Sequence, residues 1–179
     1  FDDWAENVKN FTYPDYDVFL ADNSLTKDFS EYIKSIGFNS INITNEENKE
    51  SVLSRVATSH ELCRQYAMRN NYDYILHLET DVIPPIDVIE NLLTHKKKIV
   101  SATYDIFQGK TLSVGLGCIL ISRPVFARFP FRNIKGASWF PDVVWINDVY
   151  AKKVPIYAHT GVICRHKNSN WGVFGKDYK

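Results

Sequence analysis

The chain has 179 residues, a length that fits one domain and leaves little room for two. Lys and Arg total 21, and Asp and Glu also total 21, so the formal net charge is zero. This balance argues against a general nucleic-acid binder, whose affinity would rest on neutralising phosphates. Hydrophobic residues make up 45% of the chain and charged residues 23%, which excludes disorder and collagen-like repeats. No apolar run approaches the roughly 20 residues that span a bilayer.

The three cysteines, Cys63, Cys118 and Cys164, form no C-x-x-C pair. Because their number is odd, we expect free thiols rather than a disulfide framework. Nothing after Phe1 resembles a secretory leader. These features predict a reducing, cytoplasmic environment.

Apolar runs alternate with amphipathic stretches from the beginning of the chain. A short buried strand is predicted at 17–21, followed by a helix that Thr26 caps and Gly37 ends. A second strand is predicted at 38–44. A longer helix is predicted over 51–69, with Asn70 and Asn71 as its stop. Its buried stripe is predicted to consist of Val52, Val56, His60, Cys63 and Ala67.

The second half continues this alternation. Residues 74–78 are predicted to form a strand buried on both faces. Two prolines, Pro84 and Pro85, break the chain before a short helix, and strands are predicted at 99–103 and 118–122. A Gly-rich segment joins these two strands. The late helix has a predicted apolar face of Val143, Ile146 and Tyr150.

A chain that alternates strands and helices is typical of right-handed βαβ units. We therefore predict an α/β fold: one domain over residues 1–179, with a mostly parallel central sheet flanked by helices. In such sheets ligands bind beyond the carboxyl ends of the strands. The informative residues are therefore those that follow each strand.

Acidic residues follow two of the predicted strands. Asp22 comes after the first, and Glu79 and Asp81 come after the strand at 74–78. If that strand continues, period-2 alternation places both carboxylates on one side. Two acids at the mouth of a buried strand need neutralisation, which a hard divalent cation would supply. The alternative is that Glu79 caps the strand and Asp81 begins the turn before Pro84.

Four segments of the chain, taken in order, carry a family resemblance. The first is the stretch from Asn71 to Pro85 with its E-T-D triplet, and the second is the G-L-G-C-I-L-I-S-R-P-V-F run ending at Phe126. The third is the segment 140–153, in which Asp142 opens a helix. The fourth is the strand 161–166, which ends in His166. Together they resemble the D-x-D type, family-2-like glycosyltransferases of the GT-A fold, which use nucleotide sugars. The compact length would suit a small member carried by an archaeal virus, active in the host cytoplasm.

The resemblance implies a single GT-A-like, Rossmann-related domain whose usual first strand would precede Phe1. It also implies transfer of a sugar from a nucleoside diphosphate sugar to the hydroxyl of a glycan or glycoprotein. The metal, Mn²⁺ or Mg²⁺, would be held by Asp81 and His166, with Glu79 reaching it through water or contacting the ribose. The chain departs from the pattern in that its triplet begins with Glu rather than Asp. His166 has the alternative of a surface histidine at a strand end, and His159 is the second candidate ligand.

The remaining site residues have a functional and a structural interpretation each. Asp22 would read the base or ribose, or else stabilise an Asx turn. Arg55 would contact the donor phosphate or base, or else be a solvated helix residue. Asp142 would be the base that deprotonates the acceptor, which implies inversion, or else a plain N-cap. Asp148 is a weaker base candidate.

Other residues and functions complete the hypotheses. His77 is expected to pack in the core, and Trp139 and Trp171 are candidates to line the acceptor site. A sugar nucleotidyltransferase is an alternative function that requires a Gly-rich, Arg-containing loop after the first strand. A non-catalytic carbohydrate-binding protein is another, and it predicts no metal dependence.

Overall fold

The computed structural model describes residues 1–24, 26–42, 51–106, 111–113, 115–136 and 139–167. The chain divides into two units, each assembled from separate stretches of sequence. The first unit comprises Phe1–Pro14, Tyr74–Ser122 and Pro155–Lys179, and the second comprises Asp15–Asp73 and Arg123–Val154.

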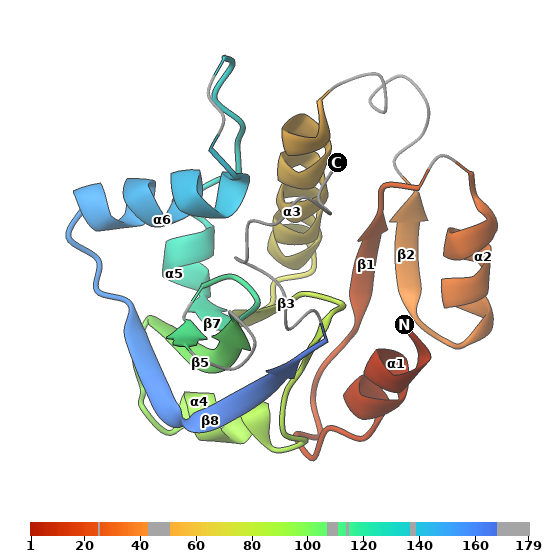
Figure 1. The fold of residues 1–179 in the computed structure, drawn as a ribbon, viewed down its shortest axis with the longest axis horizontal. Coiled ribbons are helices and arrows are strands. Elements are labelled where there is room, and N and C mark those ends of the chain that lie inside the picture. Colours follow the sequence, from red (N-terminus) through yellow and green to blue (C-terminus); the bar gives the residue numbers. More distant parts are fainter. Residues whose placement is uncertain (25, 43–50, 107–110, 114, 137–138, 168–179) are drawn as a thin grey trace. The chain divides into compact units, whose positions relative to one another are not determined.

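The first unit is built around a mixed sheet. Its six described strands follow the order β3-β7-β5-β8-β4, with β6 paired to β5 (Figure 1). Two helices belong to the same unit, α1 (Asp2–Lys9) and α4 (Val88–Leu93). The strands are β3 (Tyr74–Leu78), β4 (Val82–Ile83), β5 (Ile99–Ile106), β6 (Thr111–Ser113), β7 (Cys118–Ser122) and β8 (Tyr157–His166).

The prediction of a mostly parallel sheet is wrong. Among the described strands of this sheet, β5 and β8 run parallel and the other pairs run antiparallel. A parallel connection needs a crossover of a dozen or more residues, usually a helix. After β5 the chain instead returns through β6, which pairs antiparallel with β5, and then through β7. The Gly-rich segment therefore lies between β5 and β7, which run antiparallel, and does not connect parallel strands.

The core of the first unit surrounds β7 and β5. All five residues of β7 are buried, as are the first six of β5. The strand β3 lies where it was predicted, but it is not buried on both faces: Tyr74 is exposed and the other residues are half-buried. The reason is its place at one end of the strand order, where only β7 pairs with it.

The second unit holds a parallel pair of short strands with helices beside them. The strands β1 (Phe19–Asp22) and β2 (Asn39–Asn42) pair in register from Phe19 opposite Asn39 (Figure 1). The predicted second strand extends to residue 44, and its last two positions lie outside the described residues. The helices are α2 (Asp28–Ser35), α3 (Val52–Arg69), α5 (Arg123–Phe126) and α6 (Pro141–Ala151).

Helix ends in this unit test the predicted caps. Ser51 caps α3, because its side chain accepts a hydrogen bond from the Ser54 amide, and Asn70 ends that helix. Gly37, just beyond α2, has φ of +92°, the left-handed conformation that glycine adopts without strain. Thr26 is not the cap of α2, since Lys27 occupies that position. Val52 is also not part of the buried stripe of α3, because it is 59% exposed in the first turn.

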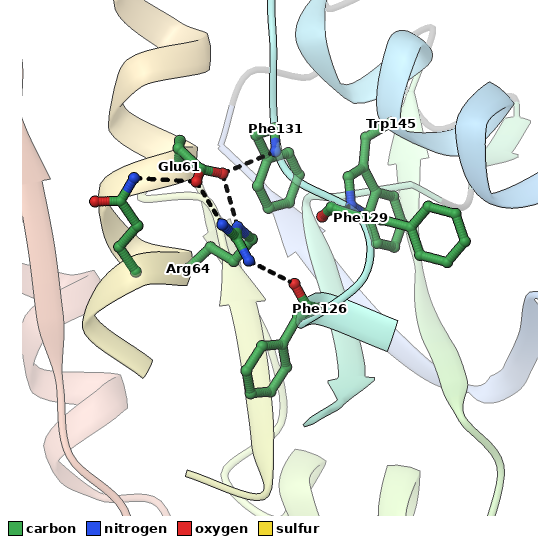
Figure 2. A network of polar contacts seen from close by, with 7 residues as sticks. Glu61, Arg64, Phe126, Phe129, Phe131 and Trp145 are labelled. Atoms are coloured by element: carbon green, nitrogen blue, oxygen red, sulfur yellow. Dashed lines mark hydrogen bonds and ion pairs between the residues drawn. The ribbon is translucent and has the colours of Figure 1, made fainter. Parts of the chain in front are cut away.

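A polar network ties α3 to the chain that leads from α5 to α6 (Figure 2). Glu61 accepts two hydrogen bonds from the Arg64 guanidinium, at 2.6 and 2.7 Å, and one from the Phe131 amide at 3.0 Å. Arg64 also donates to the carbonyl of Phe126 at 2.9 Å. Further along, the Trp145 indole donates to the Phe129 carbonyl at 3.1 Å. These bonds fix the entry to α6 from an otherwise irregular segment.

Candidate functional site

The acidic triplet lies in a turn of the first unit. The strand β3 ends at Leu78, and the amide of Val82 donates to the carbonyl of Glu79 at 3.1 Å, which closes a turn over residues 79–82. The strand therefore does not continue through the triplet. The alternation that would place the Glu79 and Asp81 carboxylates on one side does not apply here, because the turn reverses the chain.

The same turn brings Asp81 to His166. Val82 is the pairing partner of His166 where β4 runs antiparallel to β8, and the Lys167 amide donates to the Asp81 carbonyl at 2.7 Å. The Asp81 Oδ2 atom lies 3.6 Å from the His166 Nε2 atom. The imidazole is 2% exposed and the carboxylate 43% exposed. An accessible carboxylate thus lies against a buried imidazole.

These two side chains fit a divalent cation. A separation of 3.6 Å is short enough for both atoms to ligate one ion at about 2.1 Å each. Imidazole and carboxylate are both acceptable to Mn²⁺. Across the described parts of the chain, no cluster of three or more His, Cys, Asp or Glu side chains could hold a metal. Among the described residues, Glu79 therefore does not join Asp81 and His166 in a three-residue metal cluster, and its contact with a metal or ribose stays a prediction.

Tyr104 supports His166 from β5. The two rings stack with centroids 5.7 Å apart and an interplanar angle of 20°. Tyr104 is 9% exposed, and a Cβ atom added at Gly115 or Gly117 would lie 2.8 Å from its side chain. The two glycines therefore leave the space that the tyrosine ring fills. This supporting role of Tyr104 was not predicted, although the G-x-G spacing is a signal that a bulky side chain packs against this segment.

Substituting alanine at the two glycines should test the packing of the Tyr104 hydroxyl and of the Tyr104 ring one at a time. We expect Gly115→Ala to destabilise the protein by about 1–3 kcal/mol, because the new methyl meets the Tyr104 hydroxyl oxygen. In a Tyr104→Phe background this cost should largely disappear. Gly117→Ala should remain destabilising in that background, since its methyl meets ring carbons at 2.8 and 2.9 Å. Urea unfolding measures the loss of unfolding free energy for each glycine variant, with and without Tyr104→Phe. If Tyr104→Phe removes the loss equally for both glycine variants, the packing described here is contradicted.

Three further histidines of the first unit have other contacts. His159 contacts His95 edge to face, with ring centroids 4.7 Å apart, and its Nδ1 accepts from the Gly161 amide. His77 is half-buried on β3, with Nδ1 2.6 Å from the Leu116 carbonyl oxygen. The structure thus pairs Asp81 with His166 and gives His159 a different neighbour.

The other predicted site residues belong to the second unit. Asp22 is 4% exposed at the end of β1, and its two carboxylate oxygens accept from the Ser24 amide and the Ser30 hydroxyl, each at 2.9 Å. The bond to Ser24 is that of an Asx turn, and a nucleotide contact stays a prediction. Arg55 is half-buried in the first turn of α3. Its contact with a donor also stays a prediction.

Asp142 lies in the first turn of α6. Phe140 is the N-cap and Pro141 follows it, so the interpretation of Asp142 as the N-cap is wrong. Among the described residues, no hydrogen-bond partner reaches its Oδ1 atom, which is buried. An N-cap role does not account for this buried oxygen, and a role as proton acceptor stays a prediction.

The buried face of α6 differs from the predicted one. Pro141, Val144, Trp145 and Val149 are buried, whereas Val143 and Tyr150 are exposed. This helix is apolar on several sides, so the spacing of its apolar residues did not identify the core face.

Two neighbouring features of α6 also bear on the predictions. Asp148 is held by Arg132 through bonds of 2.8 and 3.0 Å, which occupies both of its oxygens. Just before the helix, Trp139 is 54% exposed, and Trp171 lies outside the described residues.

Comparisons with known proteins concern the fold. No family model matches the chain, and no curated protein is similar to it in sequence. The structure resembles the crystal structure of A197 from STIV, with a TM-score of 0.52 and 16% identity over 85% of each chain. It is also similar to a glycosyltransferase involved in the glycosylation of the major capsid of PBCV-1, with a TM-score of 0.45 and 12% identity, covering 80% of this chain and 82% of that one. The likeness to A197 is one of fold.

Proposed function

We propose that the protein is a metal-dependent glycosyltransferase of GT-A type, which moves a sugar from a nucleoside diphosphate sugar to an acceptor hydroxyl. One observation carries the proposal. Asp81 and His166 come from segments far apart in the sequence, and a turn and a strand pairing bring their oxygen and nitrogen atoms within 3.6 Å. The four ordered segments that resemble the family support it.

In the part of the chain that the structure describes, no helix has the length and apolar character needed to cross a bilayer.

Asp81 and His166 would hold the metal ion. When bound, Mn²⁺ or Mg²⁺ supplies positive charge that stabilises the diphosphate as it leaves. The Asp81 carboxylate is accessible and the His166 imidazole is buried, so Asp81 is the member of the pair that a donor from solvent could approach. Asp22 and Arg55 are proposed to contact the nucleoside or its phosphates, and Glu79 the ribose or a metal-bound water.

Asp142 would remove the acceptor proton. In the proposed step the acceptor oxygen bonds to the anomeric carbon, and the bond from that carbon to the phosphate oxygen breaks. The electron pair of the broken bond stays on the nucleoside diphosphate, while the acceptor proton moves to the Asp142 carboxylate. Attack opposite the leaving group inverts the anomeric centre. Exposed Trp139, beside this residue in sequence, is proposed to stack on the acceptor glycan.

Binding calorimetry with UDP, GDP and dTDP, each with and without Mn²⁺, tests the function. We expect one nucleotide to bind in a Mn²⁺-dependent manner. Asp81→Asn should weaken that binding at least tenfold, because it removes a charged metal ligand. Asp87→Asn, which changes an exposed acid of the same unit, is the matched control and should bind as wild type. If no nucleoside diphosphate binds in the presence of Mn²⁺, the protein is not such an enzyme, and a non-catalytic carbohydrate-binding protein becomes the better hypothesis.

A further inference from the structure

The N-terminal helix α1 contacts the chain at Glu79, where the acidic turn over residues 79–82 begins, and at Pro84, just after the strand β4 that follows the turn. Trp4 donates from its indole nitrogen to the carbonyl of Glu79 at 3.1 Å. One helical turn later, Asn7 donates from its side-chain amide to the carbonyl of Pro84, also at 3.1 Å. The two bonds therefore bracket the segment that contains Asp81, and both come from a single rigid element far away in sequence.

The carbonyl that Trp4 contacts is the one that closes the turn. The Glu79 oxygen accepts from the Val82 amide as well as from the Trp4 indole. A carbonyl has two lone pairs, so both bonds can form together. Trp4 is 4% exposed, which shields the indole bond from competing water. The position of this carbonyl fixes the turn, and the turn fixes where the Asp81 carboxylate lies.

The same helix also reaches the histidine strand. Asp3 pairs with Lys167 and, at 3.4 Å, with Arg165, the two residues that flank His166. The hydrogen bond from Lys167, more than any other contact, lowers the pKa of the Asp3 carboxyl. Asp3 therefore places a negative charge beside the two cations next to the imidazole. Through side chains of its first two turns, the helix contacts residues that flank Asp81 and residues that flank His166.

From these contacts we infer that Trp4 is a positioning residue for the Asp81–His166 cation site, and that α1 acts as a brace that holds the acidic turn against β8. The inference rests on the proposed function, since it assumes that this pair binds a cation. Its structural part concerns the turn alone and can be measured without any ligand. Trp4 touches no substrate in this scheme; it acts through the Glu79 carbonyl.

Trp4→Phe tests the inference, because it keeps an aromatic ring and removes the indole N–H donor. Hydrogen exchange should show faster exchange at the amides of Val82 and Lys167, which lie on either side of Asp81. Amides in the β3–β7 pairing should be unaffected. Mn²⁺ affinity, measured by calorimetry on the full chain, should fall about tenfold, as is common when a residue that orients a metal ligand is changed.

A matched control exists in the second unit. Trp145 is also buried and donates from its indole nitrogen to a backbone carbonyl at 3.1 Å. Trp145→Phe therefore makes the same chemical change in the unit that does not contain the turn. It should leave the exchange rates of the Val82 and Lys167 amides and the Mn²⁺ affinity unchanged.

If Trp4→Phe does not fold, Asn7→Ala is the second variant. It removes the hydrogen bond to the Pro84 carbonyl and should produce the same changes to a smaller degree.

The possible outcomes separate the two proposals. Faster exchange confined to the turn, together with weaker Mn²⁺ binding, supports the positioning role. Unchanged exchange at Val82 and Lys167, or a loss of protection spread equally over β3 and β7, overturns it. If the wild-type protein binds no Mn²⁺, the proposed function fails and the positioning of a cation site fails with it. Intact Mn²⁺ binding in a Trp4→Phe protein whose turn exchanges faster overturns the inference alone and leaves the function standing.

Discussion

Replacing Asp142 with Asn is expected to lower the rate of sugar transfer by about 10²–10⁴-fold, the usual contribution of a general base. The amide keeps the size of the carboxylate but cannot accept the proton. Donor binding should be retained, because the proposed contacts to the donor come from other residues. The measurements are nucleoside diphosphate release from the donor that calorimetry identifies, and the dissociation constant for that donor in the same variant.

Asp148→Asn is the matched control for this prediction. It changes a second aspartate of α6, one whose oxygens are both held by Arg132. We expect its transfer rate to remain close to that of wild type. If Asp142→Asn loses donor binding and transfer to the same extent, Asp142 is a structural residue. If both variants lose transfer equally, the effect comes from the helix and not from a proton acceptor.

Glu61→Ala is expected to lower the free energy of unfolding by about 2–3 kcal/mol. The substitution removes the carboxylate that accepts two hydrogen bonds from the Arg64 guanidinium and one from the Phe131 amide, so these partly buried N–H groups lose that partner, while the bond from Arg64 to the Phe126 carbonyl remains (Figure 2). The Glu61 side chain is 20% exposed and the Arg64 side chain 14%, so water replaces these bonds only in part. Urea denaturation measures the loss. Glu31→Ala changes an exposed acid of α2 and is the control. It should change the free energy of unfolding by about 0.5 kcal/mol at most, as is usual for surface substitutions.

The same network predicts a pH dependence of stability. Burial raises the pKa of Glu61, but the hydrogen bonds from Arg64, Gln65 and the Phe131 amide outweigh it and lower the pKa below its usual value. The carboxylate therefore stabilises the fold above the pKa it has in the unfolded chain, and this contribution disappears as the pH falls through the folded-state pKa. The difference in unfolding free energy between wild type and Glu61→Gln should shrink over that acid range. A difference that stays constant with pH would contradict the ionised state of Glu61.

Local patterns in the sequence predicted many of the elements but not their pairing. The helix 52–69 and the strands at 74–78 and 118–122 were predictable, because periodicity and caps act within a few residues. Whether β7 runs parallel or antiparallel to β5 depends on the path of the chain between them, and no local pattern encodes that path. The partial exposure of β3 follows from its place in the strand order, which is likewise a property of the whole sheet.

The site residues were likewise predictable only where a sequence motif marked them. The pairing of Asp81 with His166 was expected from the family resemblance, and alternation along the strand would not have found it, since the triplet lies in a turn. The contributions of Tyr104 and Trp4 were not predicted. Each acts through packing or a backbone carbonyl contributed by a distant element, and neither carries a motif of its own.

The most direct test of the central claim is electron spin-echo spectroscopy of Mn²⁺ bound to the protein together with the nucleoside diphosphate. A nitrogen atom coordinated to Mn²⁺ modulates the echo, so the signal reports whether an imidazole is a ligand. We predict nitrogen modulation in the wild-type complex and its loss in His166→Gln. Bound Mn²⁺ without nitrogen modulation, or modulation that persists in His166→Gln because His95 and His159 bind the ion instead, would contradict a cation site formed by Asp81 and His166.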